Sequence, residues 1–102
     1  MATGTINIGP TLVVDTAVDD NITISANGAS NRTFNCAKTG YTALGVVGFA
    51  VANASSSGSN ASYAVVRGCF LASATTVTIY IRNDYNAEAK VKSTAYVLYR
   101  KD

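Results

Sequence analysis

Residues 75–83 of this chain read TTVTIYIRN, and most of this stretch alternates between apolar and polar side chains. Apolar residues occupy every second position from 77 to 81, while Thr78, Tyr80 and Arg82 lie between and after them. Successive side chains of a β-strand point to opposite faces, so this pattern predicts a strand with one face in a core and the other toward solvent. Such half-buried strands are typical of antiparallel sheets.

Similar segments lie along the rest of the chain. They are rich in Val, Ile, Thr, Tyr and Phe and are separated by Gly, Asn, Asp and Ser, which favour turns. The residues 19–21 and 84–86 are expected to be such turns. About seven strands in one short chain predict a single all-β domain, residues 1–102, built as an antiparallel β-sandwich or jelly roll. The expected strands are 12–15, 21–25, 32–37, 41–53, 62–72, 75–83 and 87–100.

The strand expected at residues 41–53 is apolar on both faces, although a sandwich strand has only one face in the core. The face expected to fill the core consists of Tyr41, Ala43, Val47, Phe49 and Val51. The other face carries Leu44, Val46 and Ala50, and the chain offers no helix to cover them. The chain is 48% hydrophobic and only 14% charged, against a usual charged share of about 25%. We therefore expect another subunit to cover Leu44, Val46 and Ala50.

The segment that follows this strand, residues 53–62, consists almost entirely of Asn, Ala, Ser and Gly. It has little to bury, so its composition predicts a surface loop with much conformational freedom. Loops on a rigid scaffold often carry recognition. An insertion tolerated between two strands explains the same composition, and both interpretations stay open.

Few residues of the chain are suited to catalysis or metal binding. It has no histidine, which excludes Ser-His-Asp and Cys-His nucleophile systems. Cys36 and Cys69 are too few for a typical zinc site, and we interpret them as small buried hydrophobes, although one disulfide between them stays open. The acidic residues fit turns, and no calcium motif matches their spacing. We expect no enzymatic activity, no cofactor and no metal.

The charge distribution argues against two further classes of partner. The net charge is +2 and the basic residues are scattered, whereas nucleic-acid-binding domains usually show a basic stripe with interleaved aromatic residues. No segment reaches the roughly 18 apolar residues that a membrane-spanning helix needs. We therefore expect neither nucleic-acid binding nor membrane insertion.

Saccharide recognition suits the composition better, because tyrosine combines a flat apolar ring with a polar tip. The chain has six tyrosines and no tryptophan. Tyr80, Arg82, Asp84 and Tyr85 cluster at the end of one expected strand and its turn. The candidate ligand-binding residues are Tyr80, Arg82, Asp84, Tyr85, Asn60 and Tyr63. The alternative is that these tyrosines only cover the faces of a sheet.

Two long stretches carry a family resemblance. Residues 40–62 read GYTALGVVGFAVANASSSGSNAS, and residues 76–101 read TVTIYIRNDYNAEAKVKSTAYVLYRK. The family pattern is roughly a G-Y-x-A-L-G strand, an N-A-S-x-S-G loop, an I-R-N turn and a closing K-V-x-V-x-V-L-Y strand, which the segment from Lys90 to Tyr99 matches here. These stretches resemble the C-terminal head domains of tail-fibre, or receptor-binding, proteins from bacteriophages and prophages of Gram-positive hosts. The resemblance covers a little over half of the chain and does not extend to residues 1–35.

The resemblance implies a homotrimeric head at the tip of a virion tail fibre, with residues 1–10 as the arm that connects it to the fibre shaft. It implies adhesion to the bacterial host through a cell-surface saccharide or another surface receptor, and it carries over no defined ligand residues. Two other functions stay open. The chain could be a structural trimerisation cap or virion decoration domain without a ligand, or a small depolymerase.

Overall fold

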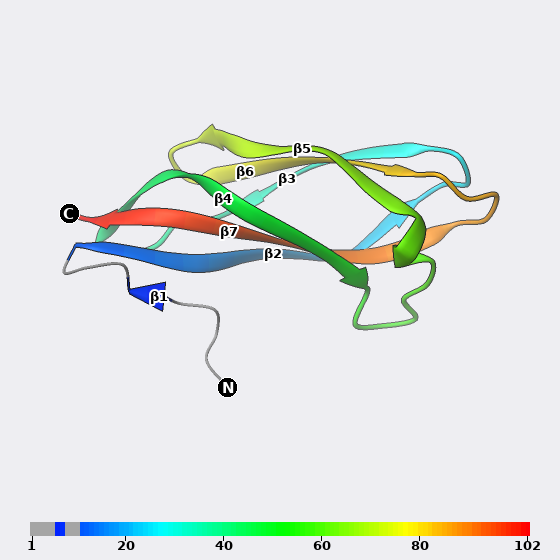
Figure 1. The fold of residues 1–102 in the computed structure, drawn as a ribbon, viewed down its shortest axis with the longest axis horizontal. Helices are drawn as coiled ribbons and strands as arrows, with labels where there is room; N and C mark the ends of the chain where they lie inside the picture. Colours follow the sequence, from blue (N-terminus) through cyan, green and yellow to red (C-terminus); the bar gives the residue numbers. More distant parts are fainter. Residues whose placement is uncertain (1–5, 8–10) are drawn as a thin grey trace.

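The computed structural model describes residues 6–7 and 11–102, and within these residues every regular element except one short 3₁₀ helix is a β-strand (Figure 1). For residues 6 and 7 the structure describes only the backbone. The expected connecting arm, residues 1–10, therefore lies outside the described residues apart from the short strand β1. The elements are β1 (Ile6–Asn7), β2 (Leu12–Ile24), β3 (Ala29–Asn35), β4 (Tyr41–Asn53), the 3₁₀ helix η1 (Ala61–Tyr63), β5 (Ala64–Ser73), β6 (Thr76–Asn83) and β7 (Ala89–Lys101).

The strands form two sheets, with the orders β1-β2-β7-β4 and β3-β6-β5, and all neighbouring strands are antiparallel. The two sheets lie one over the other in Figure 1. Each of two buried apolar clusters takes residues from both sheets. The all-β prediction is therefore confirmed, with two antiparallel sheets packed as layers.

The central strands β6 and β7 supply most of the core, and their alternation is the one the sequence predicts. Val77, Ile79 and Ile81 of β6 are buried, as are the odd-numbered residues of β7 from 89 to 99. Full burial of each large aliphatic side chain contributes roughly 1.5–3 kcal/mol, so these two strands account for much of the packing energy. At the end of β7, the buried Tyr99 hydroxyl donates to the Cys36 carbonyl, and burial raises the pKa of Tyr99 to about 12.

Both cysteines are free thiols that contribute to the core. Cys36 is buried in one cluster, and Cys69 packs against both clusters. Burial raises the pKa of each thiol. The interpretation of these residues as small hydrophobes is therefore consistent with the structure.

The expected turn at residues 19–21 is wrong, because β2 runs through it as one strand of 13 residues. The pairing of β2 with β7 shifts between Asp19 and Ile22, which places a bulge at Asp20 and Asn21. Asn21 has a positive φ of 57°, a conformation that asparagine tolerates better than most residues. A bulge absorbs residues that look like a turn while the strand continues beyond it.

The expected faces of β4 are also partly wrong, although its bounds match. The pairing of β4 with β7 shifts twice, between Ala43 and Gly45 and between Val46 and Gly48. Each shift exchanges the faces of the residues that follow. Val46 therefore packs against the core instead of facing a partner, and Val47, at the second shift, is 58% exposed. The second shift restores the original alternation, so Phe49 lies opposite the buried Ala95. Phe49 is nevertheless 51% exposed instead of filling the core, because β4 is an edge strand. Leu44 and Ala50 are exposed, as expected.

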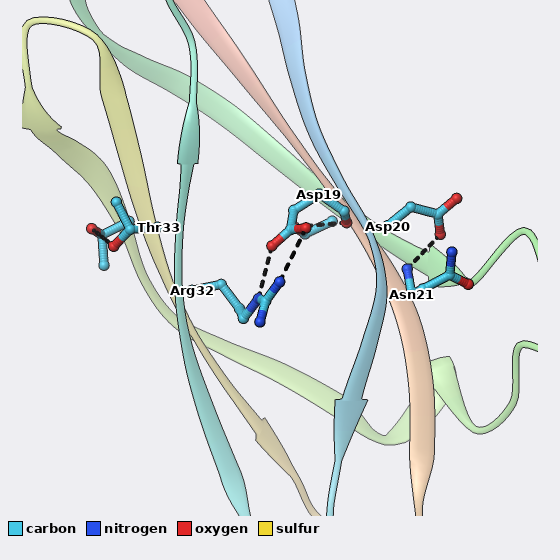
Figure 2. A network of polar contacts seen from close by, with 7 residues as sticks. Asp19, Asp20, Asn21, Arg32 and Thr33 are labelled. Atoms are coloured by element: carbon cyan, nitrogen blue, oxygen red, sulfur yellow. Dashed lines mark hydrogen bonds and ion pairs between the residues drawn. The ribbon is translucent and has the colours of Figure 1, made fainter.

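The two long sides of the molecule differ in chemistry. On the side where β2 lies beside β3, Arg32 of β3 forms an ion pair with Asp19 of β2 at 2.8 Å (Figure 2). Lys38 forms a second pair with Asp15 at 2.7 Å. On the other side, β4 and β5 are the edge strands of their sheets. They expose the apolar side chains of Leu44, Val47, Phe49 and Val65. One side is thus closed by ion pairs, and the other presents apolar edges.

Candidate ligand-binding site

The turn at residues 25–28 and the loop 84–88 between β6 and β7 lie at the end of the molecule opposite the C-terminus (Figure 1). The segment 54–63, which ends in η1, lies below the sheets toward the same end. The Asn27 N–H donates to the Tyr85 carbonyl at 2.8 Å, and the Asp84 N–H donates to the Tyr63 carbonyl at 3.1 Å. We call this part of the surface the loop end.

Asn83, the last residue of β6, holds the loop end together. Its side chain is fully buried, and its amide nitrogen donates to the carbonyls of Ile24, Ser25 and Ala87 at 2.8–3.3 Å. Its side-chain oxygen accepts from the Tyr85 N–H at 3.1 Å. A buried amide with these partners ties β2 and the 25–28 turn to the 84–88 loop at a defined distance.

Tyr63 and Tyr85 form the most prominent feature of the loop end. Their rings are stacked with centroids 4.1 Å apart and an angle of 6° between the ring planes. Tyr63 comes from η1 and is 43% exposed, and Tyr85 comes from the 84–88 loop and is half-buried. The stack therefore presents aromatic surface to solvent at a place fixed by backbone hydrogen bonds on both sides.

Planar polar groups lie next to this stack in the sequence. The Arg82 Nε and Asp84 Oδ1 atoms are 2.6 Å apart, and about half of each side chain is exposed. An ion pair this exposed contributes little to stability, on the order of 0–1 kcal/mol. Its groups are available to hydrogen-bond a ligand, because a guanidinium and a carboxylate together offer several donors and acceptors in fixed planes.

The segment 54–60 is more constrained than its composition predicts. Ser59 and Lys90 exchange two backbone hydrogen bonds of 3.0 Å, and the Ala54 N–H also donates to the Lys90 carbonyl. Gly58 packs so closely against the backbone of Ala54 that a Cβ atom there would overlap it. Hydrogen bonds from the Ser55 side chain and backbone lower the pKa of Asp20, which lies in the β2 bulge. The segment is therefore a surface loop, as expected, but hydrogen bonds hold its two ends.

The structure brings together five of the six predicted ligand residues. Tyr63, Arg82, Asp84 and Tyr85 lie at the loop end, and the Asn60 side chain donates to the Glu88 carbonyl of the same region at 2.8 Å. Asn60 has a positive φ of 60° and precedes η1, so it also turns the backbone into this helix. Tyr80 lies next to Arg82 on the outer face of β6, outside the loop end.

The sequence analysis missed two residues, one at the loop end and one beside Tyr80. Asn83 was part of the I-R-N pattern, but no feature of that pattern distinguishes a buried asparagine from a turn residue. Phe70 lies edge-on to Tyr80, with centroids 5.5 Å apart and an angle of 75° between the planes. Its position on an outer face follows from the register of β5 with β6, which shifts between Val66 and Gly68.

The described part of the chain contains no group of three or more Cys, Asp or Glu side chains placed to hold a metal ion, and no enclosed pocket. None of its helices is long and apolar enough to cross a membrane. No family model, curated protein or solved structure matches the chain.

Proposed function

We propose that this chain is the receptor-binding head of a phage tail fibre, and that its loop end attaches the virion to a saccharide on the bacterial surface. The observation that carries the proposal is the exposed Tyr63–Tyr85 stack with the Arg82–Asp84 pair next to it in the sequence. Aromatic faces bind the C–H faces of sugar rings, and planar charged groups bind their hydroxyls. The family resemblance supplies the biological setting.

The position of the site supports this role. The loop end lies opposite the C-terminus and is built from connecting segments held on a rigid two-layer scaffold. Recognition residues in many proteins are placed on loops that such a scaffold positions. On a fibre, this end would face the host while the strands provide stiffness.

A homotrimer is part of the proposal, with its interface on the β4 side of the molecule. The exposed apolar residues of this edge strand are Leu44, Val47 and Phe49, whereas Val46 of the same strand packs against the core and is not part of the interface. An uncovered apolar edge strand is prone to pair with other chains, so native proteins usually cover it. Three identical copies around one axis would bury three such edges. Several weak sites on one fibre would then gain avidity.

The strand order supports a jelly-roll-like description of the fold. β2 pairs with β7, the last strand, and four of the connections between consecutive strands from β2 to β7 cross from one sheet to the other. Chains that wind between two sheets in this way characterise jelly rolls, which have eight strands. The described strands correspond to a smaller version of that arrangement.

The test is binding of the purified chain to an immobilised panel of cell-wall polysaccharides from Gram-positive bacteria. We expect at least one polysaccharide to bind, and Tyr85→Ala to weaken that binding about tenfold or more, because it removes half of the aromatic stack. The Tyr85 carbonyl accepts a hydrogen bond from the Asn27 N–H, and the Tyr85 N–H donates one to the Asn83 side chain. Neither bond involves the ring, so the loop should keep its shape.

Two arginines provide the matched control. Arg82→Ala removes the guanidinium next to the loop end and should weaken binding, whereas Arg100→Ala removes another exposed arginine near the C-terminus and should not. A chain that binds no polysaccharide of the panel contradicts the proposal and favours a structural cap. Release of soluble fragments from the panel would instead indicate a depolymerase.

A further inference from the structure

The outer face of the β3-β6-β5 sheet forms a regular grid of side chains with Tyr80 at its centre. Residues directly opposite each other on antiparallel strands share a face. The register therefore places Asn31, Tyr80 and Gly68 in one row of this face, and Thr33, Thr78 and Phe70 in the next row. Arg82 lies in the row on the other side of Tyr80, between Ala29 and Val65. We call these nine positions the sheet platform.

The Tyr80 ring lies over Gly68. A Cβ atom at Gly68 would be 3.4 Å from the Tyr80 Cδ2 atom, which is ordinary contact distance. The ring therefore lies close to the backbone at Gly68, and it is still 39% exposed. Phe70 packs edge-on against it and holds it on one side. The platform thus presents a fixed aromatic ring to solvent.

The two sides of the Tyr80 ring differ in polarity. Toward β5 lie the exposed apolar side chains of Val65 and Phe70. Toward β3 lie the exposed amide of Asn31 and the Thr33 hydroxyl, which shares a hydrogen bond of 2.8 Å with Thr78. An aromatic ring bordered by amide and hydroxyl groups matches a pyranose, which has an apolar C–H face and a rim of hydroxyls.

The platform and the loop end are continuous along β6. Arg82 belongs to the platform, and its ion pair with Asp84 reaches the loop that carries Tyr85. Tyr80 and Asp84 are four residues apart, or about 13 Å at the usual rise of a strand. One monosaccharide is too short to contact both groups, whereas a chain of pyranose units is long enough.

We propose that the sheet platform binds a pyranose chain that lies flat across Tyr80 while one end of the chain is held at the Tyr63–Tyr85 stack. The proposal rests on the proposed function, because it extends the same site. It assigns the ligand class as an oligosaccharide or polysaccharide and not a terminal monosaccharide. Asn31, Thr33 and Phe70 become ligand-contacting residues, in addition to Tyr80.

The experiment uses the polysaccharide panel and its acid-hydrolysis fragments, sorted by size from one to six units. Backbone amide chemical shifts of the ¹⁵N-labelled chain report where each fragment binds. Single units are expected to shift only amides at 60–63 and 84–88, and six-unit fragments should also shift those of Asn31, Thr33, Phe70 and Tyr80. Affinity should rise about tenfold over this length range.

Tyr80→Leu keeps apolar cover over Gly68 but removes the flat ring, and we expect it to abolish the gain of affinity with length. Tyr96→Leu is the matched control. The Tyr96 ring lies over Gly48 on the outer face of the other sheet, with a Cβ-to-Cδ2 distance of 3.6 Å, and this variant should keep the gain. If a variant does not fold, the chemical shifts of the wild-type chain still show whether longer fragments contact the platform.

The outcomes separate the two proposals. Fragments that bind with equal affinity at every length, with shifts confined to the loop end, overturn the platform and leave the proposed function standing. A panel from which nothing binds overturns both. A fall in the molar mass of Tyr80→Leu would show that the platform faces another copy of the chain, which also overturns its role in glycan binding.

Discussion

Asn83 shows how a single buried side chain can position a site. It is fully buried, yet each polar atom of its side chain has a partner, and these partners come from β2, from the 25–28 turn and from the 84–88 loop. The Tyr63–Tyr85 stack depends on this arrangement, because Tyr85 is held through its backbone N–H and carbonyl and not through its ring alone.

Asn83→Ala is therefore expected to lower the free energy of unfolding by about 3 kcal/mol, since it removes several hydrogen bonds of a buried side chain, including the buried bond to the Ile24 carbonyl. Asn86→Ala changes an exposed asparagine of the same loop and should cost no more than about 0.5 kcal/mol. Urea denaturation of both variants measures the difference. Equal losses in the two variants would mean that Asn83 is not the residue that holds the loop end.

At the scale of strands, bulges decide which residues reach the surface. β2 continues through Asp20 and Asn21 because a bulge accommodates them, and Asn21 adopts a positive φ there. In β4, two register shifts turn Val46 inward and leave Leu44 and Val47 exposed. These irregularities produce the apolar edge of the molecule and anchor Asp20 beside Ser55.

Asn21 offers a direct test of the β2 bulge. Asn21→Val is expected to destabilise the chain by about 1–2 kcal/mol, because a β-branched residue is strained at positive φ. Asn21→Gly should be close to neutral, and so should Thr23→Val, which is exposed on the same strand beyond the bulge. Thermal unfolding of the three variants gives the comparison. If Asn21→Val proves as stable as Thr23→Val, the conformation assigned to the bulge is wrong.

The same strands show what the sequence can and cannot predict. Val77, Ile79 and Ile81 alternate without interruption, so their burial was predicted correctly from periodicity. Val46 was misplaced, because a bulge exchanges faces without leaving a mark in the apolar pattern. Phe49 lies opposite the buried Ala95, as its alternation predicts, but it is half exposed because β4 is an edge strand. The proximity of Tyr63 to Tyr85 was also beyond reach, since it depends on loops that only the packed sheets bring together.

At the scale of the whole molecule, the uneven sides suggest how copies assemble. Ion pairs from Asp15 and Asp19 close the β2–β3 side, while Leu44, Val47 and Phe49 make the β4 side apolar. A trimer formed through the β4 side would cover these residues and leave the loop end free for ligand. Adhesion by a fibre tip would require both a covered apolar edge and a loop end that is free to bind ligand.

Light scattering after size exclusion, at several concentrations, tests this assembly most directly. For the wild-type chain we predict a mass of three times the 10.6 kDa of one chain. For Phe49→Asp we predict the mass of a single chain, because burying an unpaired charge at the apolar edge would cost too much free energy. Val18→Asp, at an equally exposed apolar position on β2, should leave the mass unchanged. A wild-type mass of one chain at every concentration would contradict the trimer and the interface assigned to β4.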